Sequence, residues 1–300
     1  MTFLGGFPMV DVSRRAFLTS LAAIGGVALT GKLGIADPHK PTLKSGVDMV
    51  TLGRTGLKTS VLGIGTGTVG GSQQLAMGSD SFGKMVRYAL ERGVHYIDTA
   101  DNYNTHIFVR LALQATPRVP REKYFIQTKT RARSAEVLHA DIERFRRELR
   151  VDYIDSVLMH CMTTGSWPTD MRPVMDALYE EKQKGRVKAI GVSCHGWEPL
   201  VASVDVDWCD VQLARINPFG AKMDGEPKDV AAVLKKMHDA GRGIIGMKIY
   251  GETGLNSREE RLQSLSYVLG LGCVDCFTIG FTSIEQIDET LQLIEEALKA

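Results

Sequence analysis

The sequence has little cysteine, almost no net charge and no evident metal-ligand spacing, and each absence excludes a class of protein. Its five cysteines among 300 residues are too few and too irregularly placed for a disulfide scaffold. A formal net charge of +1, with acidic and basic residues interspersed, leaves no electrostatic footprint for nucleic acid. No grouping of His, Cys and Asp has the spacing of a metal site. What remains is an ordinary globular protein, either two domains or one large α/β barrel.

The first 36 residues differ in composition from the rest of the chain. Arg14 and Arg15 precede a mildly apolar run over 17–29, which is shorter than the roughly 20 residues that span a bilayer. A basic pair before a short apolar stretch is the layout of a bacterial export signal. Here it resembles a twin-arginine signal, although a peripheral N-terminal helix is the alternative.

We therefore expect 1–36 to be a twin-arginine export signal and 37–47 to be a linker. The twin-arginine export machinery would be a partner, and the folded protein would reach the periplasm of a Gram-negative host, with no stable membrane insertion. Ala36 is a poor cleavage site, so an uncleaved anchor stays open. Translation from Met49 would instead give a cytoplasmic protein.

From residue 48 onward, short β-rich runs alternate with amphipathic helical stretches. The candidate strands are 61–64, 94–97, 124–128, 156–159, 189–192, 209–213, 243–247 and 276–279. Eight nearly continuous apolar strands alternating with eight helices predict a parallel sheet buried on both faces. Eight is also the number that closes a barrel. The fold class is therefore α/β: a (β/α)8 TIM barrel over 48–300, with a short N-terminal β-hairpin that turns at Gly53–Gly56.

Four polar side chains follow three adjacent predicted strands. Asp98 ends the second strand and Tyr103 lies in the loop beyond it, Lys129 ends the third strand, and His160 closes the fourth. Function in such a barrel sits at this end of the strands. A nearby ammonium stabilises a phenolate, a carboxylate keeps that ammonium charged, and a histidine can hold a substrate oxygen. Each residue alone has a structural explanation, but together they predict proton donation to a carbonyl oxygen.

These residues lie in motifs that resemble the aldo-keto reductase family. The family's opening resembles residues 52–60 and 62–67, and its signature segment resembles residues 93–103. Lys129 and His160 match the other two members of its catalytic tetrad. The resemblance implies transfer of a hydride from a nicotinamide cofactor to an aldehyde or ketone, with Tyr103 as the general acid.

The resemblance also implies residues that hold the nicotinamide. Ser193 and Gln212 match the residues that bind the carboxamide, but Cys194 replaces the asparagine that usually follows the serine. Met247 stands where an aromatic side chain commonly stacks on nicotinamide. Lys248 follows it and would meet the pyrophosphate or form a structural salt bridge.

The start of the last helix is the second predicted cofactor contact. Gly280, Thr282 and Ser283 open this helix, and a capping box of Thr282 and Glu285 would leave N–H groups for a phosphate. Gln286 stands where an arginine for the adenosine 2′-phosphate is common. The choice between NADP and NAD therefore stays open.

A glycine-rich segment gives a competing interpretation. Residues 65–70 form a literal G-x-G-x-x-G after a strand, and Asp98 follows at a later strand end, which favours a Rossmann-type dehydrogenase. That fold leaves Lys129 unexplained, and the next helix begins late, near Ser81. In a barrel, the same glycines let the first loop pass close to a cofactor, with Gly65 and Thr66 as contacts. An exported cofactor-binding regulatory or sensor protein on the same scaffold is a further alternative.

The substrate-binding residues are less marked. Trp167 follows the fourth strand, Tyr250 follows the seventh, and His195 lies near the predicted mouth of the barrel. The sequence ends with the last helix, so we expect an open site for a small carbonyl substrate. Cys273 and Cys276 have C-x-x-C spacing at a strand start, where buried structural cysteines are favoured over a redox or metal pair.

Overall fold

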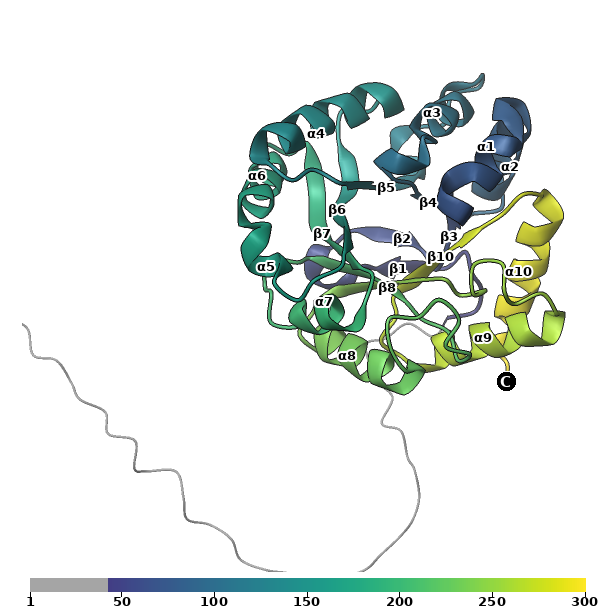
Figure 1. Cartoon of the computed structure of the whole chain (residues 1–300). Coiled ribbons are helices and arrows are strands. Elements are labelled where there is room, and N and C mark those ends of the chain that lie inside the picture. Colours follow the sequence, from purple (N-terminus) through teal and green to yellow (C-terminus); the bar gives the residue numbers. More distant parts are fainter. Residues whose placement is uncertain (1–42) are drawn as a thin grey trace, which may run out of the picture. The chain divides into compact units, whose positions relative to one another are not determined.

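The computed structural model describes residues 43–300, so the predicted export signal and most of the predicted linker lie outside the described residues. Eight parallel strands close into a barrel in the order β10-β3-β4-β5-β6-β7-β8-β9 (Figure 1). They are β3 (Leu62–Gly65), β4 (Tyr96–Asp98), β5 (Phe125–Thr130), β6 (Ile154–Met162), β7 (Val187–Cys194), β8 (Val211–Arg215), β9 (Gly243–Met247) and β10 (Cys276–Gly280). The predicted (β/α)8 barrel is confirmed.

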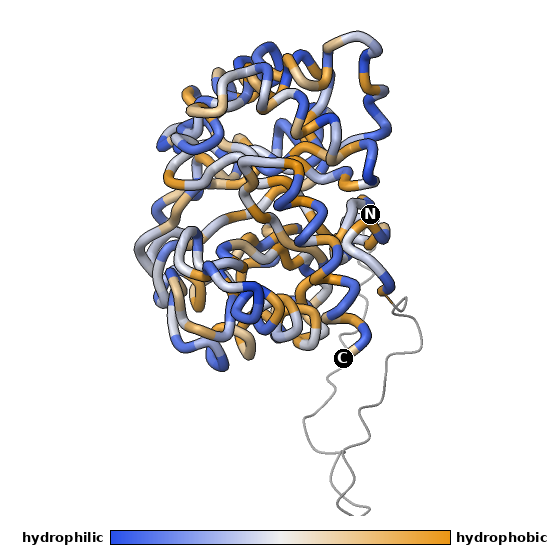
Figure 2. The backbone as a smooth tube through the Cα atoms, turned by 90° about the vertical axis from the view of Figure 1, so that its right-hand side faces the viewer, coloured by the Kyte–Doolittle hydropathy of each residue, from blue (hydrophilic) through white to orange (hydrophobic). Residues whose placement is uncertain are grey.

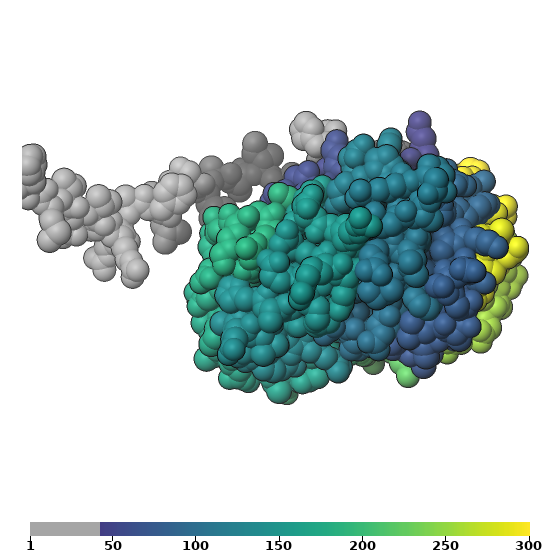
Figure 3. Space-filling view, turned by 90° about the horizontal axis from the view of Figure 1, so that it is seen from above, coloured from purple at the N-terminus to yellow at the C-terminus, as the bar shows by residue number. Residues whose placement is uncertain are grey.

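Helices surround the barrel. They are α1 (Ser72–Ala76), α2 (Gly78–Glu91), α3 (His106–Gln114), α4 (Ala135–Leu149), α5 (Trp167–Asp170), α6 (Arg172–Gln183), α7 (Trp197–Ala202), α8 (Pro227–Asp239), α9 (Arg258–Gly270) and α10 (Ile284–Ala297). Their buried apolar residues belong to the core, and the tube in Figure 2 alternates between hydrophobic and hydrophilic residues along the chain. Helices α2, α3, α4 and α6 lie side by side in blue to teal on one outer face (Figure 3). None of the helices within 43–300 is long and apolar enough to cross a bilayer.

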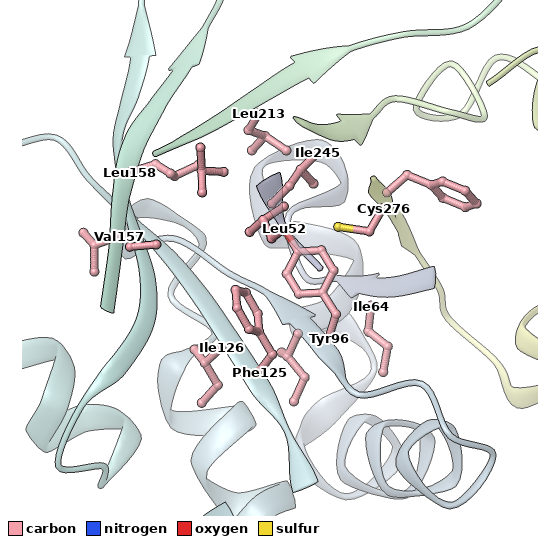
Figure 4. Close-up of a cluster of buried hydrophobic side chains, with 14 of the residues drawn as sticks. Leu52, Ile64, Tyr96, Phe125, Ile126, Val157, Leu158, Leu213, Ile245 and Cys276 are labelled. Atoms are coloured by element: carbon pink, nitrogen blue, oxygen red, sulfur yellow. The ribbon is translucent and has the colours of Figure 1, made fainter. Parts of the chain in front are cut away.

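The predicted hairpin closes the amino-terminal end of the barrel. Strands β1 (Met49–Thr51) and β2 (Lys58–Ser60) pair antiparallel, and Leu52 between them is fully buried in the barrel core (Figure 4). The turn requires Gly53, which has a φ of +48° and whose Cβ would lie 2.2 Å from the amide nitrogen of Gly243. The hairpin is thus fitted against the base of β9.

The barrel interior combines aromatic packing with a few hydrogen-bonded polar groups. The rings of Tyr96 and Phe125 meet edge-on, with centroids 5.5 Å apart (Figure 4). Gly63 makes room for Tyr96, since a Cβ there would lie 2.1 Å from that ring. Cys273 and Cys276 are both buried, and burial raises the pKa of the Cys276 thiol well above its ordinary value.

Several boundaries differ from the sequence-based prediction, such as β6, which runs on to Met162, and two of them lie outside the barrel strands. Residues 43–47 were expected in the linker, but the carbonyl of Gly46 accepts a hydrogen bond of 2.8 Å from Leu62 N, so this end of the linker packs on the barrel. The helical segment after the glycine-rich loop begins at Ser72, well before the expected Ser81. The left-handed backbone of Gly71, with a φ of +94°, turns the chain directly into that helix.

Candidate active site

A buried ion pair joins the carboxyl ends of β4 and β5. Lys129 Nζ lies 2.7 and 2.8 Å from the two carboxylate oxygens of Asp98, and it donates a third bond of 2.8 Å to the carbonyl of Thr99. Gln127 Nε2 donates to Asp98 Oδ1 at 2.9 Å. The lysine is only 1% exposed, so these bonds are what offsets its desolvation. Burial disfavours the ammonium, but the attraction of Asp98 and then Tyr103 outweighs it, and the pKa of Lys129 is raised.

Tyr103 lies in a short 3-10 helix directly after β4. Lys129 Nζ lies 4.9 Å from the centre of its ring, and the ring of His160 meets it edge-on at 5.6 Å. The loop that begins at Gly67 packs on the other side, because a Cβ on Gly67 would lie 2.3 Å from Tyr103 Cε2 and one on Gly71 would lie 2.5 Å from Tyr103 O. Gly67 and Gly71 thus make room for the tyrosine, and Gly65 and Gly67 also line the cavity described below.

The acidity of Tyr103 differs from the sequence-based expectation. Burial raises the pKa of the phenol, and although Lys129 opposes this, the negative charge of Asp98 adds to it, so the net shift is upward. In the structure, the Lys129 ammonium is already bound to a carboxylate, which reduces its effect on the phenol.

His160 sits at an irregularity in β6. The register with β7 shifts between Met159 and Met162, and Cys161 has a φ of +62°. Burial, followed by the charge of Lys129, lowers the pKa of His160 to about 2, so the imidazole is neutral. Its Nδ1 has no hydrogen-bond partner in the part of the chain that the structure describes. A neutral imidazole can bind a substrate oxygen through one of its ring nitrogens.

Residues behind the tetrad fix the loop that carries Tyr103. Arg144 of α4 donates a bond of 2.7 Å to Asp101, and His106 bridges Thr128 and Glu148 with two contacts of 2.7 Å. Carboxylates hold the pKa of Arg144 above its ordinary range. These groups were not identified from the sequence.

Two neighbouring cavities open beside the tetrad. The first, of about 110 Å³, is lined by Asp98 and Tyr103, by five of the predicted binding residues and by others from β9 and β10. Those five predicted residues are Gly65, His195, Lys248, Tyr250 and Gly280. The second, of about 360 Å³, is lined by Thr282 and Gln286 and shares Tyr250 with the first. An elongated ligand could occupy both.

Three of the predicted contacts are turned away from these cavities. Thr66 is fully buried, and its hydroxyl bonds that of Thr105 at 2.7 Å. Ser193 Oγ accepts a bond of 2.9 Å from Cys161 N. Trp167 is 1% exposed, and its indole donates to Pro199 O, so it packs under α7 and does not line a substrate pocket.

The predicted carboxamide site keeps one feature that fits a bound amide. The Oε1 of Gln212 is buried and has no partner among residues 43–300. Cys194 Sγ lies 3.2 Å from Ser203 Oγ and 3.4 Å from Pro199 O, so it faces α7. Gln212 therefore offers an unused acceptor, while the cysteine offers no amide contact.

The last helix is capped differently from the prediction. Ser283 is the N-cap residue of α10, and the amide of Thr282 donates a bond of 2.8 Å to Gln286 Oε1. The expected capping box of Thr282 and Glu285 is therefore replaced by Gln286. Lys248 forms an ion pair of 2.5 Å with Glu252, which is the salt bridge that the sequence left as an alternative.

Fold and site together define the class: a closed (β/α)8 barrel with a buried Asp–Lys pair, a tyrosine and a neutral histidine at the carboxyl ends of its strands. The model of the aldo/keto reductase family matches residues 61–267. The chain therefore belongs to the aldo/keto reductase family, whose members are oxidoreductases that use nicotinamide cofactors.

Individual relatives are similar over part of their length. L-galactose dehydrogenase of Arabidopsis thaliana is 29% identical over 49% of this chain and 48% of its own. Methylglyoxal reductase DkgB of Escherichia coli O157:H7 is 35% identical over 45% of this chain and 51% of its own. The chain spans about half the length of these curated relatives. An aldo-keto reductase of Bacillus halodurans in its holo form shares the fold, with a TM-score of 0.69 at 19% identity over 84% of this chain and 95% of its own.

Proposed function

We propose that this protein reduces an aldehyde or ketone with a nicotinamide cofactor, and that Tyr103 is the general acid. The observation that carries the proposal is the placing of the Tyr103 ring between Lys129, 4.9 Å from its centre, and the neutral His160 at 5.6 Å. When bound, the cofactor supplies the hydride. The unused Oε1 of buried Gln212 and the two adjoining cavities support its fit.

Each residue of the tetrad has a separate role in this mechanism. His160 binds the carbonyl oxygen and orients it toward Tyr103, whose hydroxyl gives its proton to that oxygen as the alcohol forms. The phenolate left behind is stabilised by the Lys129 ammonium. Asp98 holds that ammonium charged and in place through its two short bonds.

Small aldehydes are the substrates to test first, because two of the relatives are methylglyoxal reductases. The experiment follows the loss of NADH or NADPH absorbance with methylglyoxal and simple aldehydes. Steady turnover supports a reductase. A tightly retained cofactor with negligible turnover would favour the regulatory or sensor alternative.

We propose that NADH is preferred over NADPH. The cavity lined by Thr282 and Gln286 carries the carboxylates of Glu252 and Glu289 but one guanidinium, Arg261, which Glu289 binds at 2.9 Å. Lys248 pairs with Glu252 and Arg261 pairs with Glu289, so a 2′-phosphate there would meet no unpaired cation among the lining residues. A relative of Escherichia coli, 25% identical over 59% of this chain, is an NADH-specific methylglyoxal reductase, which supports the preference.

Fluorescence titration of the full chain checks this preference. NADH should bind at least about fivefold more tightly than NADPH. Glu289→Gln should bring the two dissociation constants closer together, because it frees Arg261 to bind the 2′-phosphate of NADPH. Glu285→Gln on the same helix is the matched control. Equal dissociation constants in the unaltered protein would contradict the proposal.

We also propose export through the twin-arginine route, on the evidence of Arg14-Arg15 and the apolar run that follows. Replacement of both arginines by lysine should leave the protein in the cytoplasm of a Gram-negative host. Fractionation and N-terminal sequencing of the native protein provide the measurement. An N-terminus at Met49 in the unaltered protein would disprove it.

A further inference from the structure

Arginines at the mouth of the barrel have no part in the proposed reduction. Arg131 and Arg133 follow β5, and Arg215 is the last residue of β8. We propose that Arg131, supported by Arg133 and Arg215, binds a carboxylate carried by the substrate, so that the protein selects carbonyl compounds that are also acids. This inference rests on the proposed reductase function and names the substrate class of the same site.

The direction of the Arg131 side chain follows from its neighbours on the strand. Lys129 reaches Asp98 inside the barrel, whereas Thr130 Oγ1 donates a bond of 2.7 Å to Asp141 on the outer helix α4. Successive side chains of a strand point to opposite faces. Arg131 directly follows Thr130, the last residue of β5, and we infer that the same alternation places it on the side of Lys129, above the tetrad.

The charge of Arg131 acts on both histidines of the site. The rings of His160 and His195 lie 6.3 Å apart, and burial chiefly lowers the pKa of each, to about 2 and about 4. Arg131 lowers the pKa of both rings further, and Arg133 lowers that of His160. Positive charge thus stands close to the position of the carbonyl group.

Arg215 is only loosely compensated. Its Nη1 lies 3.3 Å from Asp224 Oδ1, which also accepts a bond of 2.8 Å from Gly196 N. Its Nε is buried and has no partner in the described part of the chain. After burial, Arg215 is the largest cause of the lowered pKa of His195. This guanidinium is therefore not fully paired within the described residues, and its charge acts on the neighbouring histidine.

The acidic groups at this end of the barrel already have cationic partners. Asp98 binds Lys129, Glu252 binds Lys248, and Asp224 lies against Arg215. Within residues 43–300, neither Arg131 nor Arg133 has a carboxylate within 4.0 Å. Arg133 donates instead to the backbone carbonyls of Arg131 and Ala132. An anionic ligand would supply the missing charge.

The phosphates of the cofactor do not account for Arg131 and Arg133, whereas Arg215 pairs with Met247 of β9 and lies nearer the cofactor side. The cavity that continues away from the tetrad is lined by residues that follow β9 and β10, such as Asn256 and Thr282. Strand β5, which carries Arg131, stands four strands away from β9 in the closed order, on the opposite side of an eight-stranded ring. Arg131 thus faces the substrate side.

Two aldehydes that differ in one carboxylate test the inference on the full chain with saturating cofactor. The specificity constant kcat/KM for 4-carboxybenzaldehyde should exceed that for benzaldehyde by about tenfold or more, the size expected for a charge-assisted hydrogen bond. In Arg131→Gln that ratio should fall toward one, mainly through a higher KM for the carboxylate. Arg172→Gln, which removes a 68% exposed arginine of α6, is the matched control and should keep the ratio.

The outcomes separate this inference from the proposed function. Turnover of neither aldehyde would contradict the reductase itself. Equal kcat/KM values in the unaltered protein would overturn the anion site and leave the reductase standing. If Arg131→Gln and Arg215→Gln each lowered kcat/KM equally for both aldehydes, the arginines would have a structural role and the anion site would also be overturned. A KM that rises with salt for the carboxylate-bearing aldehyde, and not for benzaldehyde, would support the anion site.

Discussion

Replacement of Tyr103 by phenylalanine is expected to lower kcat by about a hundredfold to ten-thousandfold, the range for loss of a general acid. The variant keeps the ring that packs on Gly67 and removes only the hydroxyl. Folding and NADH binding should therefore persist while aldehyde turnover is lost. Stopped-flow measurement of NADH oxidation reports the loss of turnover, and fluorescence titration with NADH reports whether cofactor binding persists.

The matched control is Tyr88→Phe, which removes a hydroxyl bonded to Asp288 on the outside of the barrel. It should retain full turnover. The pH profile adds a second check, because burial raises the pKa of Tyr103 and the phenol keeps its proton through neutral pH. Reduction by the unaltered protein should decline only as the pH rises through this raised pKa. Turnover by Tyr103→Phe equal to the unaltered protein would exclude Tyr103 as the acid.

Replacement of Asp98 by alanine is expected to destabilise the fold by about 3–5 kcal/mol, because it leaves the Lys129 ammonium buried without a counter-charge. Both carboxylate oxygens bind that ammonium in the structure, and Lys129 is 1% exposed. Urea unfolding measures the change. Turnover should fall as well, since the lysine would lose its charge or its place beside Tyr103.

The double replacement Asp98→Ala with Lys129→Met is the informative control. It removes both buried charges, so the free energy of unfolding should recover much of the loss, whereas turnover should not recover. If Asp98→Ala alone had the stability of the unaltered protein, the ion pair would not be a structural requirement. Together the variants separate what the pair does for the fold from what it does for Tyr103.

The tetrad could be predicted from the sequence because a parallel barrel brings the carboxyl ends of its strands to one face. Asp98, Lys129 and His160 each end a strongly apolar run, so their positions followed from the strand assignment alone. Their convergence is seen in the direct bonds of Lys129 to Asp98 and the edge-on contact of Tyr103 with His160.

Loop side chains were predicted less well, since sequence does not show which way they point. Trp167 was expected beside the substrate, but it begins the short helix α5 after β6, and its buried indole donates to Pro199 O. Thr66 was expected at the cofactor, but it bonds Thr105. The pKa of Tyr103 was expected to be lowered by Lys129, but burial and Asp98 depend on three-dimensional packing and outweigh it.

The hairpin at the base of the barrel has a practical consequence for immobilising this protein. Gly46, near the start of the described chain, bonds the first residue of β3, and Leu52 fills the amino-terminal end of the barrel. Tyr103 and the cavities lie at the other end of the strands. A solid support or fusion partner coupled just ahead of Leu43 would therefore attach at the amino-terminal end of the barrel, which the hairpin closes. Substrate could then diffuse freely to the cavities at the opposite end.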